Sequence, residues 1–188
     1  METTRAIVTA GCLGLLMVGI GGAKPTCGSP FRYSMAGTNL TSTIDTNEDG
    51  TPGGVATAAG KSTLGPIRLQ GVNEFILDTI IGSCVLPDGS QGFEFEQIVG
   101  AFVFQVRSGD LLTAEVVDGT FCGQCPDPGC IGRVTNRWQI TGGTGNFAGA
   151  SGFFEQEAIS NQLLSSPTGG FNTFVAEAEG EIHFPAAE

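Results

Sequence analysis

The chain has few of the residues on which most site chemistry depends: one His, one Trp, one Tyr and two Lys among 188 residues. A single His, His183, argues against His-based metal sites and against Ser-His-Asp triads. Eight basic residues against 19 acidic ones give a net charge of −11. Because nucleic-acid binding depends on Lys and Arg that neutralise phosphates, we expect no nucleic-acid partner.

Glycine, by contrast, is abundant, with 30 Gly beside 9 Pro. Together they make up about a fifth of the chain, above the average of about 12% and below the 25–30% of low-complexity chains. The 13 Phe and many Val and Ile are enough to fill one core. We therefore expect one folded domain in which turns hold most of the Gly.

Residues 1–23 have the pattern of a secretory signal peptide. Arg5 precedes an uncharged run over residues 6–20, and small residues stand at 21–23, so cleavage is expected after Ala23. The run is shorter than the roughly 20 residues of a membrane span. A retained anchor and a lipid attachment at Cys12 are the alternatives. We expect a single domain over residues 24–188, secreted or periplasmic, with no membrane span after cleavage.

Disulfides are the main expectation for the cysteines of an exported chain. The five that follow the leader are Cys27, Cys84, Cys122, Cys125 and Cys130. One arrangement pairs Cys27 with Cys84 and places one bridge inside residues 122–130, which leaves one thiol over. The spacing does not fix the connectivity. A zinc site and a redox pair are alternatives for 122–130, although zinc needs a fourth ligand and no helix follows the CxxC.

An acidic turn over residues 45–54 matches the first half of a calcium-binding loop. Asp45, Asn47 and Asp49 place oxygens at alternate positions before a glycine, an arrangement that can wrap a hard cation. The twelfth position is Ala56 instead of a bidentate Glu, which excludes a complete EF-hand. A shorter calcium turn and a plain Asx-rich hairpin loop are the two interpretations. No other cofactor is expected.

Alternating apolar and polar residues, separated by turn residues, predict strands instead of helices throughout the mature chain. The expected strands cover residues 31–44, 55–61, 67–77, 92–107, 111–120, 131–141, 152–160 and 171–184. Short strands at this spacing indicate a sandwich or a barrel. Eight antiparallel strands can close into a barrel, whose interior is filled by side chains or by one small ligand.

The Gly-rich segment 142–149 (GGTGNFAG) lies between two expected strands. A dinucleotide-binding loop would lead into a helix, and a P-loop needs Gly-Lys-Ser/Thr, so we expect a structural turn in which Phe147 tucks into the barrel end. Together with its flanks, residues 138–152 (WQITGGTGNFAGASG), it resembles the strand–GGTGxFxG–strand signature of allene oxide cyclases and dirigent proteins. The resemblance covers residues 131–182 and extends back to about 31 by strand rhythm.

The resemblance implies an all-β fold, a small eight-stranded antiparallel β-barrel that is dirigent-like or calycin-like. Allene oxide cyclases isomerise a fatty-acid epoxide in an apolar cavity, and dirigent proteins orient phenoxy radicals without an oxidative centre of their own. Members of both groups often associate, so a homo-oligomer is an expectation for this chain too.

If the barrel is right, one face of each strand lines its interior. The aromatic candidates for that face are Phe93, Phe95, Phe102, Phe104, Trp138, Phe154 and Phe174. They either line a ligand cavity or simply fill a packed core. Glu115, in an apolar run, is the one candidate acid or base; exposure on the alternate face is its other interpretation. Tyr33 and Gln139 can also point inward.

Three functions remain open. The first is an exported barrel that binds or orients a small hydrophobic or aromatic molecule. The second, which rests on the resemblance, is an isomerase or cyclase acting on such a ligand. The third is a disulfide-stabilised structural or interaction protein of the cell exterior.

Overall fold

The computed structural model describes residues 28–42, 45, 53–76, 79–124, 131–166 and 169–185. Several residues singled out in the sequence lie outside these ranges: the expected leader, Cys27, Asn47, Asp49, Cys125 and Cys130. Of the candidate calcium ligands, the structure therefore describes Asp45 alone.

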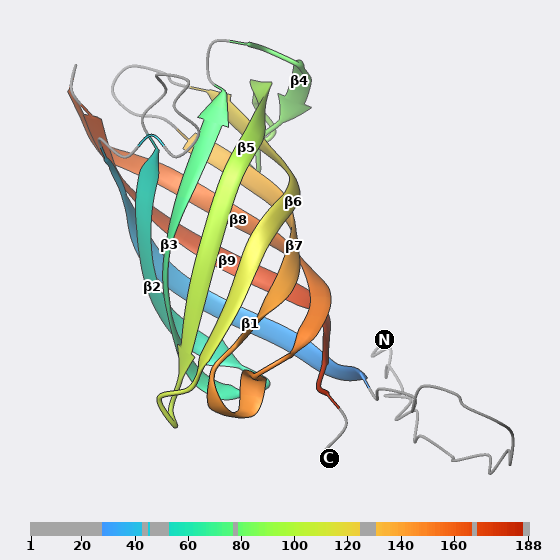
Figure 1. Cartoon of the computed structure of the whole chain (residues 1–188). Helices are drawn as coiled ribbons and strands as arrows, with labels where there is room; N and C mark the ends of the chain where they lie inside the picture. The colour runs from blue at the N-terminus through green and yellow to red at the C-terminus, as the bar shows by residue number, and fades with distance from the viewer. Residues whose placement is uncertain are drawn as a thin grey trace, which may run out of the picture.

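Nine strands and one short 3-10 helix make up the described part of the chain (Figure 1). The elements are β1 (Gly28–Thr41), β2 (Gly54–Ser62), β3 (Gly65–Ile76), β4 (Gly82–Val85), β5 (Gln91–Val106), β6 (Leu111–Gln124), β7 (Ile131–Gly143), η1 (Gly145–Phe147), β8 (Ser151–Ser166) and β9 (Gly169–His183).

Eight of the strands form a closed ring. The sheet runs in the order β3-β2-β1-β9-β8-β7-β6-β5, every pair is antiparallel, and β3 pairs with β5 to join the two ends. This confirms the predicted all-β, eight-stranded antiparallel barrel. The ninth strand, β4, was not predicted, because four residues are too few to show an alternating pattern. It pairs with β5 over Gln91–Glu94, beyond the stretch of β5 that β3 covers.

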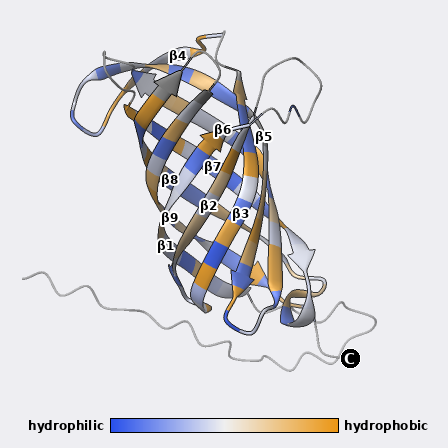
Figure 2. Cartoon of the chain, turned by 90° about the vertical axis from the view of Figure 1, so that its left-hand side faces the viewer, coloured by the Kyte–Doolittle hydropathy of each residue, from blue (hydrophilic) through white to orange (hydrophobic). Residues whose placement is uncertain are grey.

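The two-residue period of the sequence decides which side chains point inward. In β8, Phe154, Gln156 and Ala158 are buried, and Phe153, Glu155 and the other residues between them are exposed. Figure 2 shows hydrophilic and hydrophobic residues alternating along the strands of the barrel. One slip of register would exchange the two faces, so this alternation fixes the pairing.

Aromatic rings fill the interior at one end of the barrel. Phe31, Tyr33, Phe104 and Phe154 come from three strands, and all six pairs of their ring centroids lie between 5.3 and 6.0 Å apart. Most of these pairs meet edge to face, the geometry that the ring quadrupoles favour. Burial raises the pKa of the Tyr33 phenol far above its usual range, so Tyr33 behaves as a neutral core residue.

The Gly-rich segment closes that same end. Gly145 and Gly149 have φ values of 55° and 71°, in the left-handed region that glycine adopts without strain. The turn carries Phe147, which is buried and packs 6.1 Å from the ring of Phe184. The Asn146 amide also donates to the Asp110 carboxylate at 2.9 Å, which ties the turn to the β5–β6 hairpin. The predicted structural turn with an inserted Phe147 is confirmed.

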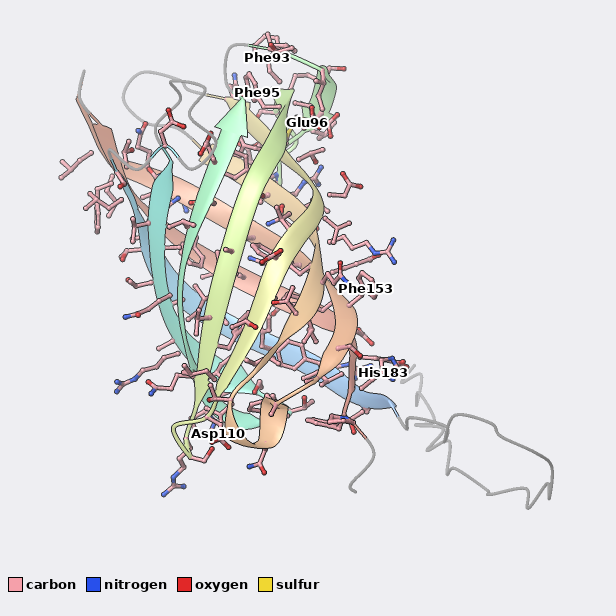
Figure 3. The ribbon with its side chains drawn as sticks, in the orientation of Figure 1. Phe93, Phe95, Glu96, Asp110, Phe153 and His183 are labelled. Carbon is pink, nitrogen blue, oxygen red and sulfur yellow. A yellow bond between two sulfur atoms is a disulfide. The ribbon has the colours of Figure 1, made fainter. Side chains whose placement is uncertain are left out.

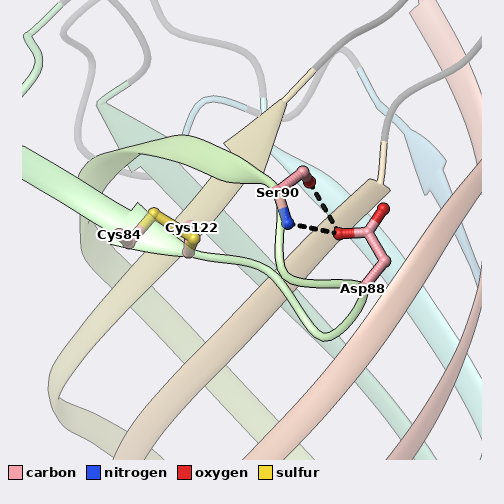
Figure 4. The surroundings of a disulfide bond; sticks show 4 residues. All are labelled: Cys84, Asp88, Ser90 and Cys122. Atoms are coloured by element: carbon pink, nitrogen blue, oxygen red, sulfur yellow. Dashed lines mark hydrogen bonds between the residues drawn. A yellow bond between two sulfur atoms is a disulfide. The ribbon is translucent and has the colours of Figure 1, made fainter.

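A disulfide joins Cys84 of β4 to Cys122 of β6, with an S–S distance of 2.05 Å (Figure 4). A Cβ atom on Gly92 of β5 would lie 3.2 and 3.3 Å from the two sulfur atoms, so a larger residue there would crowd the bridge. The pairing of Cys27 with Cys84 is therefore wrong. Gly92 and Cys122 lie beside Cys84 only because β4 pairs with β5, and the sequence did not reveal β4.

The turn from β4 to β5 is held by its own polar groups. The backbone N–H and the hydroxyl of Ser90 both donate to the Asp88 carboxylate, at 3.0 and 2.6 Å (Figure 4). These hydrogen bonds lower the pKa of Asp88. The turn therefore brings the chain back from β4 into β5 next to the disulfide.

Replacing Phe154 with Ala tests the packed end. We expect the free energy of unfolding to fall by about 3–5 kcal/mol, because the substitution leaves a cavity among the remaining rings. Phe153→Ala is the matched control: its ring lies on the outer face, with the Arg137 guanidinium 4.9 Å from its centroid, and should cost about 1 kcal/mol or less. Urea unfolding of both variants measures the difference. Equal losses would contradict the assignment of faces.

Replacing both Cys84 and Cys122 with Ala tests the bridge. We expect a loss of about 2–4 kcal/mol in the free energy of unfolding, because the cross-link spans 38 residues of the unfolded chain. Peptide mapping without reductant should recover Cys84 linked to Cys122. A link from Cys84 to Cys27 would restore the pairing that the structure rejects.

Candidate functional site

Towards the other end, where β4 lies, the interior of the barrel changes from apolar to polar. Carboxamide side chains take the inward positions there, and we call this set the carboxamide girdle. Its members are Asn39, Asn73, Gln97, Asn136, Gln156, Gln162 and Asn172. They come from β1, β3, β5, β7, β8 and β9, so amides face the lumen from six of the eight ring strands.

Strand register brings one part of the girdle together across five strands. Asn172 of β9 lies opposite both Asn39 of β1 and Gln162 of β8. Asn39 donates from Nδ2 to Asn73 Oδ1 of β3 at 3.4 Å, across the intervening strand β2. There a Cβ on Gly54 would lie 2.5 Å from Asn39 Oδ1. The glycine makes the room in which the two amides meet.

The rest of the girdle follows the same plan on the opposite wall. Asn136 of β7 lies directly opposite Gln156 of β8. A Cβ on Gly119 of β6 would lie 2.6 Å from Asn136 Oδ1 and 3.1 Å from Gln97 Oε1. Here too a glycine on the strand between two amides leaves them the space they occupy.

The girdle surrounds a cavity of about 360 Å³. Small-molecule sites occupy roughly 300–1,000 Å³, so this volume suits a ligand of one or two rings. Apolar residues complete its wall: Ala56, Phe75, Phe102, Phe121, Val134, Ala158 and Phe174. The cavity therefore combines an apolar surface with convergent polar groups, which is the usual composition of a ligand site.

Phe102 separates this cavity from the packed end. Its ring stacks on Trp138 with the centroids 4.1 Å apart and the planes at 23°. A Cβ on Gly71 of β3 would lie 2.1 Å from the Phe102 ring, so the ring occupies the space beside that glycine. Phe102 thus presents an aromatic surface to the cavity with a stacked indole behind it.

Aromatic rings also border the cavity near β4. The Phe121 ring lies 5.5 Å from that of Phe75 and 6.0 Å from that of Phe95. A Cβ on Gly132 of β7 would lie 2.1 Å from the Phe121 ring, which shows how closely the ring crosses the neighbouring strand. Phe75 and Phe121 line the cavity, and Phe95 packs behind Phe121.

Several girdle oxygens are buried without a hydrogen-bond donor among the described residues. They are Asn39 Oδ1, Asn136 Oδ1, Gln156 Oε1 and Asn172 Oδ1. Asn136 and Gln156 are only 4% and 5% exposed. A buried acceptor that neither water nor a ligand satisfies costs about 1–3 kcal/mol. Buried polar groups of this kind require an explanation, and a ligand site provides one.

The cavity has one ionisable lining residue among those described, Glu74 of β3, whose side chain is 1% exposed. No Arg, Lys or His of the described chain lines it. His183 lies at the end of β9, where its Nε2 is 3.7 Å from the Glu181 carboxylate.

Six of the seven aromatic candidates from the sequence fall into three groups. Phe102 and Phe174 line the cavity. Phe104, Trp138 and Phe154 are buried in the packed core, and Phe95 lies behind the aromatic border. Tyr33, which was also expected inside, belongs to the core.

Two inward assignments are wrong, and Glu115 takes the exposed position that was its other interpretation. Phe93 is 55% exposed and points away from the barrel in Figure 3, because it lies on the part of β5 that projects past β3. Glu115 is exposed, since its partners across the sheet, Ala101 and Gln139, are on the outer face. Gln139 therefore does not point inward, and Glu115 cannot act as an acid or base in the cavity.

Sequence reasoning missed the carboxamide girdle and Glu74. A signal for Gln156 and Asn136 was present, because each lies two residues from a buried aromatic residue, Phe154 and Trp138. Polar residues that share the inward face of a strand with buried apolar residues indicate that part of the interior is polar. Glu74 carried no such signal, because the pairing of β3 with β5 shifts register between Glu74 and Phe75.

The described ranges contain no group of three or more His, Cys, Asp or Glu arranged to hold a metal ion. Within the same ranges, no helix has the length and apolar character that crossing a membrane requires.

Replacing Gln156 with Met tests whether the girdle costs stability. We expect the free energy of unfolding of the ligand-free protein to rise by about 1 kcal/mol, because the substitution removes a buried acceptor without a donor. Gln139→Met on the outer face is the control and should change little. Thermal and urea unfolding measure both variants. A clear loss of stability in Gln156→Met would show that this amide is a structural group.

No protein-family model and no curated protein matches the chain. Among solved structures, it is similar to that of the pterocarpan synthase dirigent protein GePTS1, with 14% sequence identity and a TM-score of 0.39. The alignment covers 89% of this chain and 91% of that one. Similarity at this level establishes neither family membership nor a ligand, and the barrel itself rests on the strand pairing described above.

Proposed function

We propose that this protein is a β-barrel that binds and orients one small, partly aromatic molecule in its interior. The observation that carries the proposal is the cavity of about 360 Å³ between Phe102 and the carboxamide girdle. Phe102 and Phe174 offer apolar surface, and the amides offer hydrogen bonds of fixed direction. Such a wall holds a ligand in one orientation.

Binding accounts for the lining better than catalysis does. General acid–base chemistry usually needs two groups with different roles, and nucleophilic catalysis needs a base beside the nucleophile. Glu74 is the one ionisable group of the described lining, and carboxamides do not transfer protons at neutral pH.

An isomerase is the second candidate, and one observation favours it. The Glu74 carboxyl group lies buried at the cavity, where it can reach a ligand as a single acid or base. Recovery of a bound molecule in rearranged form would favour this candidate over simple binding.

We propose further that the protein is exported to the periplasm or the cell exterior. The signal-like pattern of residues 1–23 supports this location, and so does the Cys84–Cys122 disulfide, since such bonds persist in oxidising compartments. Mass spectrometry of the protein from its native source should find a chain that begins at Lys24.

Binding of naphthol, a neutral fluorescent aromatic molecule, tests the proposed function. We expect one naphthol per chain by isothermal titration calorimetry. Ala158→Phe should weaken binding at least ten-fold, because the new ring occupies the cavity that Ala158 lines. Ala101→Phe on the outer face of β5 is the matched control and should bind as the unchanged protein does.

Circular dichroism establishes that each variant keeps its strands, and Ala56→Met replaces Ala158→Phe if the larger side chain prevents folding. Equal binding by both Phe variants would place the naphthol outside the cavity. No binding at all would overturn the proposal and favour a structural role.

A further inference from the structure

The girdle has more hydrogen-bonding capacity than a simple aromatic molecule can use. Four of its oxygens, on Asn39, Asn136, Gln156 and Asn172, have no donor among the described residues. A ligand that satisfies them must bring several O–H or N–H groups. Ethers, ketones and hydrocarbons bring none, so they leave the buried acceptors unpaired at a cost in affinity.

The charge of the lining further limits the class of ligand that the cavity can bind. Carboxylate and phosphate ligands need a cationic partner when they leave water, and no Arg, Lys or His of the described residues lines the cavity. The donors that the girdle requires therefore belong to a ligand that is not an anion, and hydroxyl groups are their plainest source.

The arrangement of the amides indicates how those hydroxyl groups are placed. The girdle runs around the lumen in two arcs, one over Asn73, Asn39, Asn172 and Gln162 and the other over Gln97, Asn136 and Gln156. A pyranose ring carries hydroxyl groups around its rim, and each of them both donates and accepts. Carboxamides do the same, so the hydroxyl groups of one ligand can exchange hydrogen bonds with the amides of an arc.

The aromatic border supplies the second contact that a sugar makes. Phe75 and Phe121, with ring centroids 5.5 Å apart, line the cavity beside the girdle. The electron-rich face of an aromatic ring attracts the polarised C–H groups of a pyranose face. Phe102 and Phe174 offer the apolar surface that remains for a non-sugar part.

We infer that the cavity takes a glycoside, with its sugar ring among the girdle amides and its apolar or aromatic part against Phe102 and Phe174. This inference rests on the proposed function and specifies the class of molecule that is bound. It assigns the carboxamides of the girdle a role in recognition.

Calorimetric titration with matched aromatic compounds tests the inference. The panel holds the para-nitrophenyl glycosides of glucose, galactose, mannose and xylose, the sugar-free ether para-nitroanisole, and the anion para-nitrophenyl phosphate. We expect at least one glycoside to bind ten-fold or more tightly than para-nitroanisole, since each satisfied acceptor contributes about five-fold. The phosphate should bind more weakly than that glycoside.

Substitutions in the girdle then separate the sugar contact from the aromatic one. Asn136→Leu and Asn172→Leu should each weaken the best glycoside about five-fold or more and leave para-nitroanisole within two-fold. Gln139→Leu on the outer face is the matched control and should change neither. Asn172, which is half-buried, keeps the test available if Asn136→Leu does not fold.

Each outcome decides between the two proposals. Para-nitroanisole that binds as tightly as every glycoside overturns the sugar assignment and leaves the proposed function standing. Tightest binding of the phosphate overturns the conclusion that the ligand is not an anion. If no compound of the panel binds, and naphthol does not bind either, both proposals fall together.

Discussion

The pairing of β3 with β5 is the constraint on which the rest of the structure depends. These strands are the two ends of an otherwise linear series of eight, and their antiparallel ladder runs from Ile67 opposite Val106 to Ile76 opposite Glu96. Without it, both strands would expose unpaired backbone groups, and the sheet would have an open face. The β3–β5 pairing closes the wall around the inward side chains. These side chains therefore either fill the lumen or leave a cavity between them.

The two halves of the interior meet that requirement differently. At the closed end, Phe31, Tyr33, Phe104 and Phe154 fill the lumen, and Phe147 covers it. Towards β4, amides occupy the equivalent inward positions although apolar residues would cost less free energy there. Stability alone does not explain amides at these positions, whereas the proposed recognition of a polar ligand does.

Much of the fold was predictable because a two-residue period survives in the sequence wherever a strand is half-buried. Phe153 and Phe154 are adjacent and identical in type, yet the alternation predicts correctly that Phe153 is exposed and Phe154 is buried. The two-residue period gives the wrong result for Phe93. The alternation continues along β5 past Glu96, where the pairing with β3 ends and the barrel no longer encloses the side chains. The same period fails at Glu74, where a register shift places a carboxylate inside.

The glycines were expected mostly in turns, and several of the most informative ones lie inside strands instead. An eight-stranded barrel has an interior just wide enough for its side chains, so a cavity needs small residues on its wall. Gly54, Gly119 and Gly132 are such residues, and each leaves room for a neighbouring amide or ring that faces the cavity. Where the inward residues are large, as at Phe104 and Phe154, no cavity remains. Glycines of the cavity wall therefore determine which amides and rings face the cavity, and the size of the inward side chains determines where the cavity lies.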